Sequence, residues 1–143
     1  MKKLIAVLFI LFSSSVMATD AFWEKSRVGY TIYIDGQNGG YATTPFEDLQ
    51  TPRNVTKITN VSWDWNTLPN GAFAYKVTLC YIKPYSWQDY KCTSLFDQQG
   101  MTDAFNGLDA RGSFGMKMEP FGGTYPIYST QRVADTLRVD YNY

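Results

Sequence analysis

The stretch YKVTLCYIKPYSWQDYKCTSL, residues 75–95, decides the fold and contains the only two cysteines of the chain, Cys80 and Cys92. In its first part, Val77, Leu79 and Tyr81 alternate with other residues, which is typical of a strand with one buried face. Residues 90–96 are the predicted antiparallel partner of this strand, because a proline-containing bend separates the two segments. The stretch therefore predicts a β-hairpin.

Pairing residues 78–82 with residues 90–94 places Cys80 opposite Cys92, within reach of a disulfide. The alternatives are weaker. The spacing is not the C-x-x-C of a redox pair, and the chain has no histidine to complete a tetrahedral metal site. An even number of cysteines in an exported chain favours a disulfide. We expect this bond to stabilise the fold by about 3 kcal/mol.

The segment between the cysteines is rich in aromatic residues, notably Tyr85, Trp87 and Tyr90. Pro84 fixes the bend, so these side chains are held on a braced loop and form a candidate surface for a partner. A second interpretation is that Trp87 folds back over the sheet edge and protects it from aggregation. Both interpretations stay open from the sequence alone.

Residues 1–18, MKKLIAVLFILFSSSVMA, have the organisation of a secretory signal peptide. Lys2 and Lys3 precede an apolar run that is too short to span a bilayer, and small residues lead to a predicted cleavage after Ala18. We therefore expect export to the periplasm and a single domain over residues 19–143. The chain has 13 basic and 13 acidic residues. Removing the two lysines leaves a net charge of −2.

This charge balance, without a basic cluster, argues against nucleic acid and anionic lipid as partners. No other long apolar run follows, so we expect no membrane span. Aromatic residues make up 17% of the chain, and alternating segments are separated by glycine and proline. Strands are predicted at residues 28–34, 55–65, 73–82, 90–96, 113–119 and 133–143. These features predict an antiparallel β-sandwich, with a β-barrel as the alternative.

The sequence shows no catalytic constellation, and we expect no enzyme activity, no cofactor and no metal. Without histidine, the Ser-His and Cys-His pairs and nearly every catalytic zinc site are excluded. Carboxylates are scattered, and nothing indicates that two of them face each other as in a glycosidase. Trp63 and Trp65 flank Asp64 and could stack on a sugar, but their period of two favours the core.

From residue 58 onward, the order of short motifs resembles the FlhE family of periplasmic flagellar proteins. The matching segments are VSWDW, LPNG, KVTLC and KCTSL, then Gly100, Thr102 and Phe105, and finally GSFGMKMEPFGGTYPIY and LRVDYNY. A first segment, WEKSRVGYTIYIDG, and the signal peptide also fit. The cysteines are a departure, because family members have a tighter spacing, whereas here YIKPYSWQDYK intervenes.

The resemblance implies a small all-β periplasmic protein with a role in flagellar assembly. That family is associated with swarming and with limiting proton leakage through the flagellar export apparatus. The implied partner is a protein of the basal body or export apparatus. From the residues alone, a secreted carbohydrate-binding or toxin-type lectin module is the alternative. The sequence does not determine the oligomeric state.

Overall fold

The structure is a computed structural model that describes residues 18–36, 43, 45–53 and 56–143. The predicted signal peptide lies outside the described residues except for Ala18. Within the described residues, no helix is long and apolar enough to cross a membrane. A 3₁₀ helix at Ser129–Gln131 interrupts an otherwise all-β architecture.

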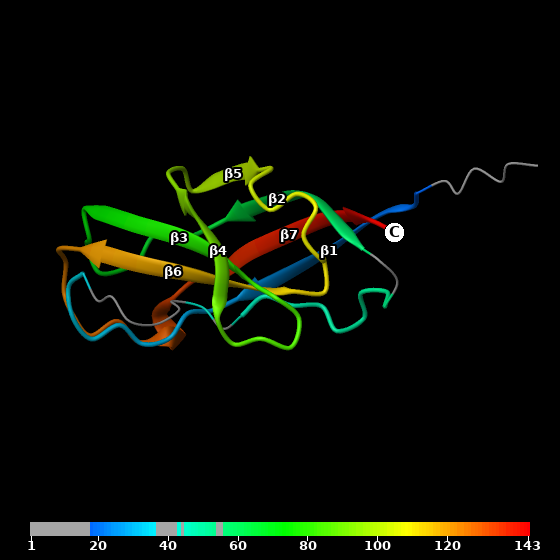
Figure 1. Cartoon of the computed structure of the whole chain (residues 1–143). Coiled ribbons are helices and arrows are strands. Elements are labelled where there is room, and N and C mark those ends of the chain that lie inside the picture. The colour runs from blue at the N-terminus through cyan, green and yellow to red at the C-terminus, as the bar shows by residue number, and fades with distance from the viewer. Residues whose placement is uncertain (1–17, 37–42, 44, 54–55) are drawn as a thin grey trace, which may run out of the picture.

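Two antiparallel sheets form the two layers of a β-sandwich (Figure 1). The first sheet has the strand order β1-β7-β2-β5 and the second has the order β4-β3-β6. The strands are β1 (Asp20–Arg27), β2 (Lys57–Asp64), β3 (Ala74–Ile82), β4 (Asp89–Leu95), β5 (Gln99–Thr102), β6 (Ser113–Phe121) and β7 (Asp135–Asn142). The sandwich prediction is confirmed. The barrel alternative is wrong, because the described strands form two sheets that each keep their own edges.

The inward faces of the central strands agree with the predicted alternation. Tyr81 of β3 packs edge-on against Phe114 of β6, with ring centroids 5.3 Å apart. Alternate residues of β3, β6 and β7 are buried, namely Val77, Leu79, Tyr81, Phe114, Met116, Met118, Leu137, Val139 and Tyr141. Burial of these side chains between the layers supplies the main stabilisation of the fold.

The predicted first strand at residues 28–34 is wrong. The chain leaves the sheet after Arg27, and Gly29 and Ile32 make only isolated bridges. The first strand is instead β1, which pairs with β7 along its whole length. Of the alternating apolar residues Val28, Tyr30, Ile32 and Ile34, only Ile32 is buried. The alternation of residues 28–34 therefore does not mark a strand. β1 itself gives little sequence signal, because it is an edge strand whose residues are mostly polar.

Two further segments lie outside the predicted strands. No strand is predicted between residues 97 and 112, but Gln99 begins β5, which crosses to the first sheet and pairs with β2. Residues 105–112, for which no state was predicted, form turns that bury Phe105 and Ala110. These turns place residue 111 beside the bend between β3 and β4.

Candidate functional site

Cys80 and Cys92 are direct cross-strand partners in the β3–β4 pair and form a disulfide. Their Cα atoms are 4.1 Å apart, which is nearest to the spacing of roughly 4.5 Å for a non-hydrogen-bonded antiparallel pair. Cys80 is buried, whereas Cys92 is exposed. The predicted disulfide is confirmed, and it ties the two arms of the hairpin together.

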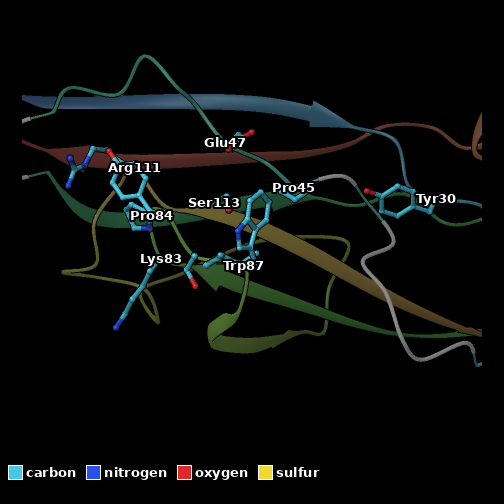
Figure 2. A pocket seen from close by; sticks show the side chains of 11 residues that line it. Tyr30, Pro45, Glu47, Lys83, Pro84, Trp87, Arg111 and Ser113 are labelled. Carbon is cyan, nitrogen blue, oxygen red and sulfur yellow. The ribbon is translucent and has the colours of Figure 1, made fainter.

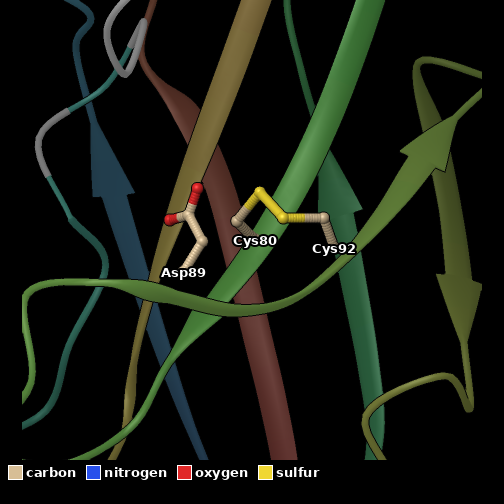
Figure 3. A group of neighbouring side chains, drawn as sticks. All are labelled: Cys80, Asp89 and Cys92. Carbon is tan, nitrogen blue, oxygen red and sulfur yellow. A yellow bond between two sulfur atoms is a disulfide. The ribbon is translucent and has the colours of Figure 1, made fainter.

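The carboxylate of Asp89 lies beside the disulfide (Figure 3). The three side chains are close enough to hold a metal ion. However, the sulfur atoms are bonded to each other, so neither is available as the thiolate that a metal requires. Asp89 accepts a hydrogen bond from Nζ of Lys117 at 2.8 Å. The cluster therefore serves as a structural brace rather than as a metal site.

The bend between β3 and β4 begins with a tight turn. The backbone N–H of Ser86 donates to the carbonyl of Lys83 at 3.1 Å, with Pro84 and Tyr85 at the central positions. Tyr85 has a φ of +60°, in the left-handed region that glycine normally occupies in a type II turn. The side chain of Tyr85 is 99% exposed. An aromatic residue is therefore held in an unfavourable backbone conformation with its ring in solvent.

Trp87 is 96% exposed, so it does not fold back over the sheet edge. The backbone N–H of Gln88 donates to Oγ of Ser86 at 3.2 Å, which continues the turn next to Trp87. Tyr90, already on β4, has Nζ of Lys83 3.6 Å from its ring centroid. This cation–π contact holds Lys83 along the outside of the hairpin.

Tyr85 and Trp87 line a hollow of about 720 Å³ at the end of the sandwich. In Figure 2, Trp87 lies between Tyr30 and Arg111. The complete lining is Tyr30, Pro45, Glu47, Ile82, Lys83, Pro84, Tyr85, Ser86, Trp87, Arg111 and Ser113. The structure thus brings together two of the three residues predicted as a contact surface. Tyr90 does not line this hollow.

A smaller hollow of about 330 Å³ adjoins the first. It is lined by Glu47, Asp48, Leu49, Thr51, Arg53, Pro84, Tyr85 and Arg111. Glu47, Pro84, Tyr85 and Arg111 line both hollows. Tyr85 and Arg111 therefore stand at the boundary between them.

Sequence reasoning missed Tyr30, Glu47 and Arg111. These residues come from three loops far apart in the chain, and only the sandwich topology brings them to the bend. Tyr30 falls within the strand predicted for residues 28–34, and the sequence gives no site near Glu47 or Arg111. The sequence around Tyr30 alternates as in a strand, so it gives no local signal that this residue lines a hollow.

The guanidinium of Arg111 is held side-on by the carboxylate of Asp109. Nε donates to both carboxylate oxygens, at 3.0 and 3.1 Å, and Nη2 donates to Oδ2. Asp109 is fixed in turn by Thr56, whose hydroxyl donates to Oδ1 at 3.0 Å. The backbone N–H of Arg111 also donates to Oδ1, at 3.0 Å. This network orients a cation at the mouth of both hollows.

Hydrogen bonds from Arg111 lower the pKa of Asp109 to about 2, against the opposing effect of burial. The same pairing raises the pKa of Arg111. Burial raises the pKa of the Tyr81 phenol to about 12, and its hydroxyl donates to the backbone carbonyl of Asp109 at 2.8 Å. Asp109 is therefore ionised and Tyr81 neutral over the physiological pH range.

No protein-family model matches this chain, and a search of curated proteins finds no significant match. Among solved structures, the chain is similar to one described as the crystal structure of FlhE. The sequence identity is 22%, and the TM-score is 0.59. The match covers 87% of this chain and 96% of that chain. At the level of the fold, the resemblance to FlhE is confirmed.

Proposed function

We propose that this chain is a periplasmic flagellar accessory protein of the FlhE type, which acts by binding a protein of the basal body or export apparatus. The supporting observation is the likeness of fold, which extends over 87% of this chain and 96% of the FlhE structure. The Cys80–Cys92 disulfide agrees with an oxidising compartment such as the periplasm. The proposed role is non-enzymatic, through limiting proton leakage or chaperoning assembly.

The proposed binding surface is the end of the sandwich around Tyr85 and Trp87. Both side chains are almost fully exposed, and the disulfide and the tight turn brace the loop that carries them. Rigid aromatic side chains bury much area on binding at a small entropic cost, which is why they dominate the energetics of many interfaces.

A deletion strain tests this proposal. Loss of the gene is expected to impair swarming or to acidify the cytoplasm of flagellated cells, and the wild-type gene is expected to restore both properties. Trp87→Ala should fail to restore them while reaching the same periplasmic level. Phe96→Ala is a matched control, because Phe96 is 90% exposed but follows β4 at its other end. Normal swarming and normal cytoplasmic pH in the deletion strain would contradict the proposal.

Saccharide binding is a second candidate. The observation that favours it is the larger hollow itself, in which Tyr30 and Trp87 stand beside the charged side chains of Glu47 and Arg111. A glycan array discriminates between the two candidates. Saccharide binding that Trp87→Ala abolishes and Phe96→Ala leaves intact would favour the lectin function.

A further inference from the structure

The free edge of the Arg111 guanidinium determines what the two hollows can recognise. Asp109 occupies the edge formed by Nε and Nη2. Within the described residues, Nη1 donates no hydrogen bond, so these residues leave the edge formed by Nη1 and Nη2 unoccupied on a partly exposed side chain. A guanidinium edge of this kind matches a carboxylate through two parallel hydrogen bonds. Arg111 thus offers a preformed pair of hydrogen-bond donors for a carboxylate at the boundary of both hollows.

An apolar wall stands next to this cation. Tyr85 and Pro84 line both hollows together with Arg111, and Trp87 lines the larger one. A ligand that reaches the guanidinium would therefore also contact aromatic surface, which favours a carboxylate attached to an apolar body.

The side chains that line the hollows carry a net positive charge, although Arg111 is already paired with Asp109. The lining side chains are three cations, Lys83, Arg53 and Arg111, and two carboxylates, Glu47 and Asp48. Asp48 is paired with Lys25, with Nζ and Oδ1 3.3 Å apart. Glu47 is consequently the one lining carboxylate for which the described residues show no ion pair. The site is complementary to a negatively charged partner, with Glu47 as an opposing group.

We propose that the two hollows bind an acidic segment of the protein partner, in which an Asp or Glu lies next to an apolar residue. The carboxylate pairs with the outer edge of Arg111, and the apolar neighbour packs against Tyr85 and Trp87. This inference rests on the proposed function, since it specifies the chemistry of the partner that the exposed loop binds.

Selection from a phage-displayed library of random heptapeptides tests the proposal, with the full oxidised chain as the immobilised target. Enriched peptides are expected to contain Asp or Glu beside an apolar residue. Enrichment of basic peptides, enrichment of purely apolar peptides, or no enrichment over the Trp87→Ala chain would each overturn the proposal.

A fluorescein-labelled copy of the most enriched peptide then measures affinity by fluorescence anisotropy. Arg111→Gln and Trp87→Ala are each expected to weaken binding about tenfold. Replacing the acidic residue of the peptide by its amide should weaken binding similarly. Glu47→Gln should strengthen it about twofold, because it removes the opposing charge. Affinities that are insensitive to all four changes would contradict the proposal.

Two further variants distinguish a loss of binding contacts from a structural effect of the Arg111→Gln substitution. Arg53→Gln changes a charge that lines the smaller hollow and is not part of the Asp109 network, and it should also weaken binding. Arg111→Lys keeps the charge but loses the two-point geometry, and it should fall between wild type and Arg111→Gln. If Trp87→Ala abolishes swarming while the selected peptides lack acidic residues, the proposed function stands and this inference fails.

Discussion

Asp109 links the buried core to the exposed hollows. Its backbone carbonyl accepts from Tyr81, while its side chain holds Thr56 and Arg111. The neighbouring Gly112 is required by the same packing, because a Cβ at this position would lie 2.2 Å from the Tyr81 ring. The turn at residues 109–112 thus connects the position of Tyr81 in the core to that of Arg111 at the surface.

The lowered pKa of Asp109 predicts a pH-dependent contribution to stability. In the unfolded chain this carboxyl has its ordinary pKa, so stability from its pairing is fully present above about pH 4. The contribution disappears as the pH falls through the folded value of about 2. The shift corresponds to at most about 2 kcal/mol, and solvent screening at this partly exposed pair reduces it to about 1 kcal/mol.

Urea unfolding at a series of pH values measures this contribution. The free energy of unfolding of wild type should fall toward that of Asp109→Asn as the pH drops from 4 to 2, with the gap closing by about 1 kcal/mol. A constant gap between the two proteins across this range would show that the carboxylate charge does not stabilise the fold.

The left-handed backbone of Tyr85 predicts that glycine is better tolerated than alanine at this position. A side chain in this region costs about 1–2 kcal/mol, and only glycine avoids that cost. Tyr85→Gly should therefore be more stable than Tyr85→Ala by about 1 kcal/mol, although both lose the ring. Thermal unfolding of the two variants provides the measurement, and equal stability would argue against the strained turn.

At the scale of elements, the β3–β4 hairpin depends on its cross-link. β4 is an edge strand with mostly exposed side chains, so it has little burial of its own to hold it against β3. Cys80 and Cys92 enclose a loop with a sequence separation of 12. Closing a loop of this size limits the unfolded chain and keeps the aromatic bend in place.

Removing the cross-link should destabilise the protein. The double variant Cys80→Ala, Cys92→Ala is expected to lose about 3 kcal/mol in its free energy of unfolding. Reductant should lower the stability of wild type by a similar amount. The double variant is its own control, because reductant should leave it unchanged. A wild type that is indifferent to reductant would contradict the role of the disulfide.

The same elements explain how far the sequence could predict the fold. Val77, Leu79 and Tyr81 face the core and alternate with other residues, so the sequence pattern locates their strand. In β1, Trp23 is the one buried hydrophobic residue, because an edge strand with a polar outer face has little pattern. β5 has only four residues, too few for alternation to be recognised.

The candidate site was predictable only in part for a different reason. Tyr85 and Trp87 could be found because they lie between two cysteines in a proline-containing segment. Arg111 and Glu47 acquire their positions from the packing of loops at one end of the sandwich, and no local pattern specifies that packing. The lack of histidine argues against Ser-His and Cys-His catalysis, but composition cannot bring together residues that are distant in the chain.

At the scale of the whole molecule, a buried ion pair helps to join the two sheets. Nη2 of Arg132 lies 3.4 Å from Oδ2 of Asp135 on β7 and 3.7 Å from the sulfur of Met118 on β6. The backbone N–H of Asn66, just after β2, donates to Oδ1 of Asp135 at 2.8 Å. Burial raises the pKa of Asp135 and lowers that of Arg132. Each charge therefore depends on the other.

Breaking this pair from one side should cost more than replacing both members. Asp135→Leu alone is expected to destabilise the fold by about 3–5 kcal/mol, because it leaves the charge of Arg132 buried. Adding Arg132→Met should recover part of that loss. A double-mutant cycle by urea unfolding measures the coupling between the two sites. Strictly additive effects would mean that the pair does not act as a unit.

The central place of β7 has a consequence for biosynthesis. β7 lies between β1 and β2, so Ala21 finds its partner only at Tyr141. Until the ribosome has released that strand, β1 has no neighbour and the four-stranded sheet cannot close. A nascent chain that lacks β7 therefore cannot complete the four-stranded sheet, and this layer of the sandwich assembles only after the last strand has been synthesised.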